Sequence, residues 1–379
     1  MFRSMRILIV ALIMIASLTV IFGVSCARGT NVLPNADSGI DVVEEAWGII
    51  FQDYVDKDRL DASMLSQAAI KGMVEALDDP YTSYLGKEAY QMNLGDIRGG
   101  FEGIGAYVTV KDGHPMIVAP FTDSPAAEAG IRAGDIILEI DGESTLEMTL
   151  TEAVLHIRGP EGTSVMLLIL HEDQIEVEEI EIIRAEIQVP SVLFEARGDI
   201  AYIAIGRFIE RTNEELYPVL ESMSQEGATG IILDLRSNPG GLLEAVVDVT
   251  SRFLREGIVL YVVDNQGKRT SLSVSSESMT TDLPMIVLVD SYSASGSEVL
   301  AGALQDHARA IIVGTQTYGK GSVNTLHQLR DGSGLIITNA RWLTPNGRLI
   351  EGEGISPDYE LEFEGEDAIH WAMDYLENN

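Results

Sequence analysis

Cysteine is almost absent from this chain. Cys26 is the only cysteine among 379 residues, and it lies close to the N-terminus. The body of the protein that follows it therefore has no intramolecular disulfide, no catalytic thiol and no cysteine-based metal site. Histidine is also scarce, with six residues that form neither an HExxH motif nor a close cluster with carboxylates. We therefore predict no metal site.

Basic residues are few compared with acidic ones. The chain has 25 Lys and Arg against 59 Asp and Glu, which gives a formal net charge of −34. So strong an acidic balance argues against nucleic acids and anionic membrane surfaces as partners. The carboxylates are expected on a solvated surface. A hydrophobic content of 46% excludes a disordered chain, and the length allows two or three domains.

The first 27 residues have the pattern of a targeting segment. Arg3 and Arg6 precede a nearly uncharged apolar run over residues 7–24. This pattern is typical of a secretory signal or of an uncleaved single-pass anchor. The sequence Ser-Cys-Ala at residues 25–27 offers a small-residue cleavage site, and its cysteine leaves lipidation open. We expect the protein to be exported across the cytoplasmic membrane and to be either membrane-anchored or secreted.

One stretch carries the signal for chemistry. An apolar, β-branched run at residues 285–289 predicts a buried strand, and the small residues 293–296, Ser-Ala-Ser-Gly, follow it. A helix is predicted next, because Ser297 and Glu298 suit a first turn. A serine on a sharp turn between strand and helix is exposed, and the backbone amides of the helix start point toward it. Such a serine is well placed as an acyl-transfer nucleophile.

A nucleophilic serine needs a base. The nearby His307 is predicted to fall deep in the helix, away from the turn. A second apolar strand over residues 310–313 leads to a lysine flanked by glycines, Gly319-Lys320-Gly321. A lysine amine acts as a base only when desolvation lowers its pKa, and the glycines allow tight packing around it.

These motifs together resemble the carboxyl-terminal processing proteases, which are Ser/Lys endopeptidases with a PDZ domain. The resemblance rests on residues 293–298, SASGSE, on residues 301–306, AGALQD, and on residues 317–323, TYGKGSV, and it covers about residues 41–379. It implies that Ser295 is the nucleophile and Lys320 the base. The two residues stand 25 positions apart, as in that family.

The resemblance also implies an oxyanion site, with two departures nearby. The loop Asn-Pro-Gly-Gly at residues 238–241 is expected beside the serine, where Gly240 would donate an amide. The family usually has alanine after the nucleophile, whereas this chain has Gly296, which keeps an amide donor. The family usually has glutamine four residues after the lysine to orient it. Asn324 stands there with one methylene less, which leaves open how the lysine is held.

Residues 99–187 differ in character, with short β-rich runs between glycine turns. The sequence FEGIG before a strand and the run SPAAEAGIRAGD at residues 124–135 resemble a PDZ domain of the bacterial protease type. The resemblance implies that Gly103, Ile104 and Gly105 present backbone amides to a peptide carboxylate. The adjacent strand edge would pair with the peptide.

The rest of the chain divides around this domain. Residues 28–40, rich in Gly, Pro, Asn and Ser, predict a linker, and residues 41–98 predict a helical N-terminal domain that includes the sequence LDDPYT. Residues 188–379 predict an α/β core, because apolar strands over 200–205 and 229–235 alternate with amphipathic helices. The resemblance implies a crotonase-like βαβ protease core.

The sequence thus predicts an exported serine endopeptidase that needs no cofactor. It would recognise C-terminal tails of unfolded or secreted proteins on its PDZ domain and cleave them with Ser295 and Lys320. An N-terminal membrane tether and a homo-oligomer are left open. The alternative is an inactive protease core whose PDZ domain only binds C-terminal peptides, and Asn324 is its best support.

Overall fold

The computed structural model describes residues 37–378, apart from residues 99, 112, 147, 172–173, 175, 276–280 and 362–364. The chain divides into two compact units, residues 1–68 and 69–379, and the boundary falls within helix α3. The expected targeting segment, residues 1–27, lies outside the described residues. Among the helices that are described, none is long and apolar enough to cross a membrane.

The first unit is helical. Its described elements are α2 (Asp37–Asp53), the short 3₁₀ helix η1 (Lys57–Arg59) and the beginning of α3 (Ala62–Glu75). Helix α2 thus begins four residues before the expected start of the helical domain at residue 41. Trp47 and Phe51 stand one turn apart on α2, and their ring centroids are 4.9 Å from each other. This contact is the i, i+4 pairing expected on one helix face.

The region expected to be a PDZ domain forms its own sheet and its own core. Its sheet runs in the order β3-β4-β5-β7-β8, and β6 pairs with β5. The elements are β3 (Ala106–Lys111), β4 (His114–Pro120), α5 (Pro125–Glu128), β5 (Ile136–Ile140), β6 (Glu143–Ser144), α6 (Leu150–Ile157), β7 (Ser164–Leu170) and β8 (Val177–Ile183). A separate antiparallel pair, β2 (Gly100–Gly103) and β9 (Ala185–Gln188), lies at its two chain ends. The expected β-rich runs are thus strands, and two short helices, α5 and α6, lie between them.

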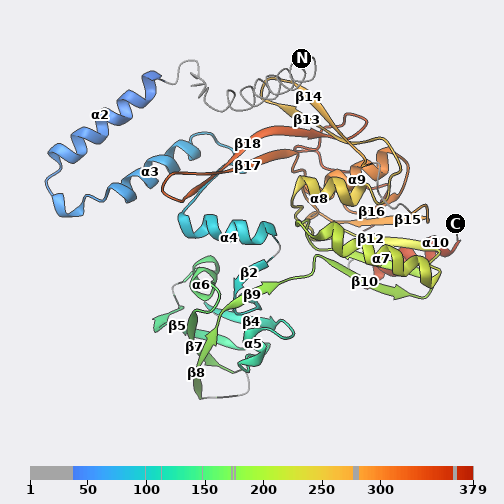
Figure 1. Cartoon of the computed structure of the whole chain (residues 1–379), viewed down its shortest axis with the longest axis horizontal. Helices are drawn as coiled ribbons and strands as arrows, with labels where there is room; N and C mark the ends of the chain where they lie inside the picture. The colour runs from blue at the N-terminus through green and yellow to red at the C-terminus, as the bar shows by residue number, and fades with distance from the viewer. Residues whose placement is uncertain are drawn as a thin grey trace, which may run out of the picture. The chain divides into compact units, whose positions relative to one another are not determined.

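The core of the remaining chain is a six-stranded sheet in the order β10-β11-β12-β15-β16-β19. The strands from β11 onward are parallel, and β10 adds an antiparallel edge. The strands are β10 (Val192–Arg197), β11 (Ile200–Ile205), β12 (Gly230–Asp234), β15 (Met285–Val289), β16 (Ile311–Gly314) and β19 (Tyr359–Glu360). The helices between them are α7 (Thr212–Glu226), α8 (Leu243–Thr250) and α9 (Gly296–Asp306), and α10 (Glu366–Asn378) closes the chain. Figure 1 labels β10, β12, β15 and β16 of this sheet together with helices α7 to α10.

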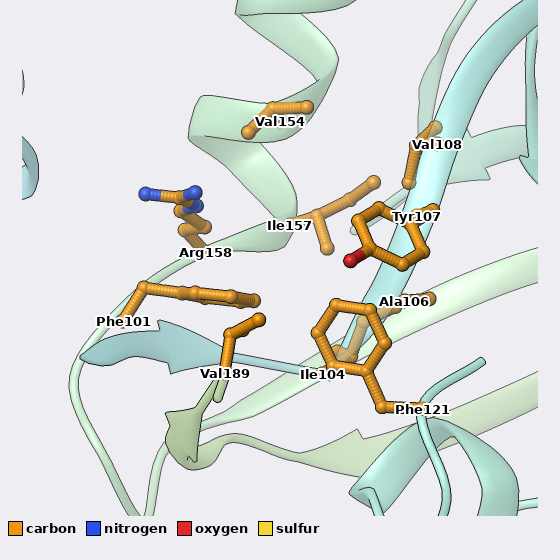
Figure 2. A pocket seen from close by; sticks show the side chains of 11 residues that line it. Phe101, Ile104, Ala106, Tyr107, Val108, Phe121, Val154, Ile157, Arg158 and Val189 are labelled. Carbon is orange, nitrogen blue, oxygen red and sulfur yellow. The ribbon is translucent and has the colours of Figure 1, made fainter. Parts of the chain in front are cut away.

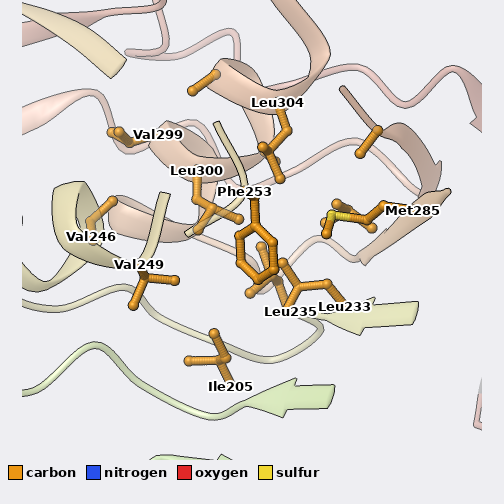
Figure 3. Close-up of a cluster of buried hydrophobic side chains, with 14 of the residues drawn as sticks. Ile205, Leu233, Leu235, Val246, Val249, Phe253, Met285, Val299, Leu300 and Leu304 are labelled. Carbon is orange, nitrogen blue, oxygen red and sulfur yellow. The ribbon is translucent and has the colours of Figure 1, made fainter. Parts of the chain in front are cut away.

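Alternation along the parallel strands supplies two apolar faces. On β12, Ile231 and Leu233 belong to the cluster that includes residues of α7, α8 and α9, whereas Ile232 belongs to the cluster with α10. Successive side chains of a strand point to opposite faces, so a sheet covered on both sides reads as a continuous apolar run. Figure 3 shows the first cluster, where Val246 of α8 and Leu300 of α9 lie among the strand side chains.

A second sheet brings distant parts of the sequence together. Its order is β1-β18-β13-β14, and β17 also pairs with β18. The strands are β1 (Ser83–Leu85), β13 (Ile258–Asp264), β14 (Arg269–Ser273), β17 (Ser322–Gln328) and β18 (Gly334–Leu343). Strand β1 precedes the PDZ region and is joined to it by α4 (Lys87–Arg98). The region expected to be a PDZ domain is therefore inserted between β1 and β10, two strands that belong to the two sheets of the remaining chain.

Candidate active site

Ser295 occupies a strained turn between β15 and α9. It is the N-cap residue of α9, with φ 53° and ψ −111°, and only 7% of its surface is exposed. A positive φ in a residue other than glycine costs about 1–3 kcal/mol and persists only when the surroundings enforce it. The turn predicted from the small residues is thus present, and Ser295 stands at its strained position. The expectation that this serine is exposed is wrong, because the loop that contains Gly240 packs against it.

The two neighbouring serines have structural roles. The Ser293 hydroxyl donates to the carbonyl oxygen of Leu235 at 2.8 Å, and the buried Ser297 hydroxyl donates to that of Asn238 at 2.9 Å. Both bonds connect the turn to the loop that follows β12. Of the three serines in the motif, Ser293 and Ser297 are therefore committed to holding two loops together.

The Asn-Pro-Gly-Gly loop packs directly against Ser295. Gly240 has φ +97°, and a Cβ placed on it would lie 2.7 Å from the Gly296 nitrogen and 2.8 Å from Ser295 Cβ. Only glycine allows this approach. The structure therefore brings Gly240 and Gly296 together, as the resemblance implied. The Gly240 amide donates to Asn238 Oδ1 at 2.8 Å, whereas Gly296 lies in the first turn of α9, where amides lack intrahelical acceptors.

Asp290 fixes the same two loops from the other side. Its carboxylate accepts the backbone amide of Ser237 at 3.0 Å and those of Tyr292 and Ser293 at 3.0 and 2.9 Å. Ser237 also has a positive φ, 58°. One carboxylate at the end of β15 thus sets the conformation of both the serine turn and the glycine loop.

Glu298 connects the serine to the lysine. This carboxylate is fully buried, and its Oε2 accepts the backbone amide of Ser295 at 2.7 Å and that of Lys320 at 2.9 Å. Its Oε1 accepts the Thr317 hydroxyl and the Gly319 amide, both at 2.6 Å. Burial raises the pKa of Glu298, and the four donors oppose that rise. Two residues 25 positions apart therefore share one acceptor atom through their main chains.

The lysine loop depends on its flanking glycines. Gly319 has φ +89°, and a Cβ on Gly321 would lie 2.1 Å from the backbone nitrogen of Glu351. The Gly352 amide donates to the Gly319 carbonyl at 2.9 Å. The glycines expected to permit close packing around Lys320 do so against residues 351–352.

The Lys320 side chain is more than half buried, and burial lowers the pKa of its amine. The charges of Glu351, Asp79 and Glu298 oppose this shift. Its Nζ lies 5.1 Å from the centre of the Tyr81 ring. Within the described part of the chain, Nζ makes no hydrogen bond or ion pair. A partly desolvated amine without a fixed partner has the properties expected of a general base.

Asn324 does not bond to the lysine amine. Its Nδ2 donates to the Tyr81 carbonyl and to Thr338 Oγ1, each at 3.0 Å. It therefore fixes the backbone of the residue whose ring faces Lys320. Its expected role in orienting the amine stays a prediction.

The LDDPYT segment contributes more to the site than sequence reasoning indicated. The sequence predicted only that it belongs to the helical N-terminal domain, yet the ring of Tyr81 and the charge of Asp79 both act on Lys320. The Thr82 hydroxyl donates to Asp79 Oδ2 at 2.6 Å and accepts the Thr338 amide at 3.1 Å, which docks the turn on β18. Nothing local in the sequence signals this contact. Glu298, by contrast, could have been found, because Ser295 and Glu298 have the S-x-x-E spacing of a capping box.

The histidines take no part in this site. His307 lies just after the end of α9, not deep within it, and its Nε2 contacts the Ile258 carbonyl at 2.8 Å. The helix ends early because Ala308 adopts a positive φ of 51°. Among the residues that the structure describes, no group of three His, Cys, Asp or Glu could hold a metal ion.

The PDZ region contains an apolar groove beside the expected carboxylate loop. A cavity of about 230 Å³ lies between β3 and α6. It is lined by Phe101, Ile104, Gly105, Ala106, Tyr107, Val108, Phe121, Val154, Ile157, Arg158 and Val189 (Figure 2). Strand β3 is the first strand of its sheet, so one edge faces this groove. Gly105 has φ +76°, and a Cβ there would lie 2.5 Å from Ser124 Cβ. The loop therefore packs against the start of the SPAAEAGIRAGD run at residues 124–135.

Comparison with known proteins agrees with this geometry. A model of peptidase family S41 matches residues 199–361, a PDZ domain model matches residues 116–170, and a model of the activating protease CtpB N-terminal domain matches residues 26–89. A probable CtpA-like serine protease of Staphylococcus haemolyticus (strain JCSC1435) is 38% identical over 326 residues, which span 85% of this chain and 64% of that protein. The protein of the same description from Staphylococcus aureus (strain COL) is 35% identical over 363 residues, which span 95% and 72%.

A solved structure supports the same assignment. A photosystem II D1 C-terminal processing protease superposes with a TM-score of 0.54 at 29% identity, over 84% of this chain and 92% of that one. The fold is therefore that of PDZ-containing serine-type peptidases. This chain belongs to peptidase family S41, among the CtpA-like serine proteases.

The packing around Gly296 explains its departure from the usual alanine and gives a first prediction. A Cβ at this position would lie 2.6 Å from Val246 Cγ2. Gly296→Ala should lower the free energy of unfolding by about 1–3 kcal/mol through overpacking. Adding Val246→Ala should recover part of the loss. Denaturant unfolding of the single and double variants measures both effects, and a Gly296→Ala protein as stable as the wild type would contradict the argument.

Glu298 gives a second prediction. Glu298→Gln replaces one acceptor oxygen with an NH₂ group that faces N–H donors, so the free energy of unfolding should fall by about 3 kcal/mol. Turnover per folded molecule should also fall, because Ser295 and Lys320 lose their common acceptor. The control is Glu215→Gln, since Glu215 accepts the Ser191 amide at 2.6 Å away from the site. That variant should lose stability and keep its turnover. Equal turnover in both variants would make Glu298 a purely structural residue.

Proposed function

We propose that this protein is a serine endopeptidase that cleaves C-terminal tails with a Ser295/Lys320 dyad. The observation that carries the proposal is the sharing of Glu298 Oε2 by the backbone amides of Ser295 and Lys320. It supports a fixed distance between the backbones of the two residues. The serine is strained and buried, and burial lowers the pKa of the lysine. Structural packing alone gives no reason for these features to coincide.

In the first step Ser295 Oγ attacks the carbonyl carbon of the scissile peptide bond, and the neutral Lys320 amine accepts the hydroxyl proton. The carbonyl oxygen becomes an oxyanion beside the first turn of α9. The Gly296 amide is the first donor to it. Gly240 supplies the second when its amide exchanges Asn238 Oδ1 for the oxyanion. No cofactor takes part.

In the second step the Lys320 ammonium gives its proton to the leaving amine, and the peptide C–N bond breaks. An acyl-enzyme ester on Ser295 remains. Lys320, neutral again, takes a proton from a water molecule that attacks the ester. This restores the Ser295 hydroxyl and releases the new carboxyl end. Because the base must be neutral, the rate should rise with pH through the Lys320 pKa, and burial moves that rise toward neutral pH.

Substrate tails dock on the PDZ groove in this proposal. The Gly103, Ile104 and Gly105 loop receives the terminal carboxylate, and the edge of β3 pairs with the peptide main chain. The apolar lining of the groove supports preference for apolar last residues. The substrates are therefore C-terminal tails of unfolded or secreted proteins. Export across the cytoplasmic membrane, with the chain secreted or anchored, rests on Arg3, Arg6 and the apolar run of residues 7–24.

The alternative, an inactive core that only binds C-terminal peptides, is supported by one observation. Asn324 Nδ2 donates to Tyr81 and Thr338, and its Oδ1 accepts the Ser322 hydroxyl at 3.3 Å, so neither end of the amide contacts Lys320. The enzyme is supported by the lowered pKa of Lys320, which burial causes, together with the Glu298 oxygen that its backbone amide shares with that of Ser295.

The dyad can be tested with four proteins and one unstructured substrate that ends in apolar residues. Ser295→Ala and Lys320→Arg should both abolish cleavage, since a guanidinium does not release its proton in a protein. Ser297→Ala is the matched control: it removes one hydrogen bond, should lower stability by about 1 kcal/mol and should keep turnover. Turnover in Ser295→Ala would refute the nucleophile. Turnover in Lys320→Arg would refute the base.

Tail recognition needs a separate test in the Ser295→Ala chain, which binds without cleaving. A peptide with a free C-terminal carboxylate should bind about tenfold more tightly than its amide, because the amide loses charge-assisted hydrogen bonds. Val154→Asp places a charge in the apolar groove and should abolish binding, whereas Val118→Asp, at a half-exposed position outside the groove, should not. Equal affinity for acid and amide, measured by calorimetry, would refute carboxylate recognition.

A further inference from the structure

Glu351 is held against the lysine loop by its backbone. The close approach of Gly321 to the Glu351 nitrogen and the hydrogen bond from the Gly352 amide to the Gly319 carbonyl lie on either side of Lys320. Ile350, which precedes Glu351, is buried in the main apolar cluster. The position of Glu351 relative to Lys320 is therefore set by main-chain contacts.

The Glu351 carboxylate is incompletely satisfied. Its Oε1 lies 4.0 Å from Arg341 Nη2, and its Oε2 is buried without a hydrogen-bond partner among the described residues. A buried carboxylate oxygen normally has a donor, and an orphaned one costs about 1–3 kcal/mol. This atom is therefore an open acceptor on the segment that packs against the lysine loop.

The other groups that face Lys320 are already engaged. Asp79 accepts the Thr82 hydroxyl and the Tyr81 amide, and Glu298 accepts four donors. The Tyr81 and Tyr318 side chains interact with each other. Arg341 is a cation whose guanidinium has no acceptor for a hydrogen bond. Of these neighbours only Glu351 combines a negative charge with an unused acceptor, and an ammonium carries three N–H donors.

We propose that Glu351 is a positioning residue for Lys320: its Oε2 accepts a hydrogen bond from the ammonium that forms when the lysine takes the serine proton. This inference rests on the function proposed above. The carboxylate accepts this bond and exchanges no proton in the scheme. It holds the ammonium between the two steps, until the proton passes to the leaving amine. Its charge also favours the ammonium, against the larger effect of burial on the Lys320 pKa.

The proposal has two kinetic consequences. Removing the negative charge of Glu351 removes a group that favours the ammonium, so the pKa of Lys320 should fall. The rising limb of the pH–rate profile should therefore move to lower pH by about 1 pH unit. The plateau value of kcat should fall severalfold, because the ammonium loses its acceptor. KM should be unchanged, since Glu351 contacts no docked tail in this scheme.

The test compares Glu351→Gln with Glu353→Gln, which removes the same charge at an exposed position two residues away. Glu351→Gln should show the shifted limb and the lower plateau, and Glu353→Gln should match the wild type. Glu351→Asp keeps the charge on a shorter stem and should lower kcat while leaving the limb near its wild-type pH. An unshifted limb in Glu351→Gln, or an equal shift in both glutamine variants, would overturn the proposal.

A readout independent of turnover separates this inference from the function beneath it. Carbon-13 labelling of the lysine Cε atoms allows Lys320 to be titrated by NMR in the Ser295→Ala chain, with the signal assigned by its loss in Lys320→Arg. The midpoint should move down when Glu351→Gln is added. If the wild type cleaves nothing and the midpoint still moves, the protease function fails and the Glu351–Lys320 contact stands. If the wild type cleaves and the midpoint does not move, only the contact fails.

Discussion

A single buried carboxylate, Glu298, organises the catalytic half of this protein. Its two oxygens collect four donors from α9 and from the loop that follows β16. Each element is positioned by its own strand of the parallel sheet. A hydrogen bond from the Tyr318 amide to the Ser293 carbonyl, at 3.0 Å, also joins the two loops, and Glu298 adds three more bonds between them. Because a fully buried carboxylate is unfavourable without partners, the loops must close around it for the core to form. Stability and the arrangement of the site therefore depend on the same contact.

The geometry around Ser295 follows from this closure. Gly240 approaches Ser295, and Gly296 packs against Val246, at places where a Cβ atom would not fit. Ser295 itself is held at a strained, positive φ. Asp290, at the end of β15, also holds the serine turn and the glycine loop in place by accepting backbone amides from both. A site built in this way needs little rearrangement before reaction, which is the preorganisation that electrostatic stabilisation of a transition state requires.

Local patterns in the sequence were sufficient for much of this. Apolar runs such as residues 285–289, with small residues after them, predicted strand, turn and helix, and the glycines around Lys320 predicted a tightly packed loop. The second sheet was not predicted, because β1 and β18 pair residues such as Ser83 and Ile336. Tyr81 and Asp79 were missed for the same reason: their contact with Lys320 depends on long-range pairing, which leaves no periodicity in a single sequence. Glu298 lay within a recognisable capping spacing, yet its second role in holding the lysine loop depends on the fold.

The pairing of β1 with β18 affects when the site can form during synthesis and folding. Residues 83–85 leave the ribosome early and must wait for residues 334–336, about 250 positions later, before they can pair. Contacts of such sequence separation form late in folding, since the loop entropy is lost before the pairing is gained. The turn that carries Tyr81 reaches Lys320 only after that pairing. A nascent or truncated chain thus has the serine and the lysine but lacks part of the surroundings of the base, so the order of synthesis itself keeps the site incomplete until the last strand of the second sheet has emerged.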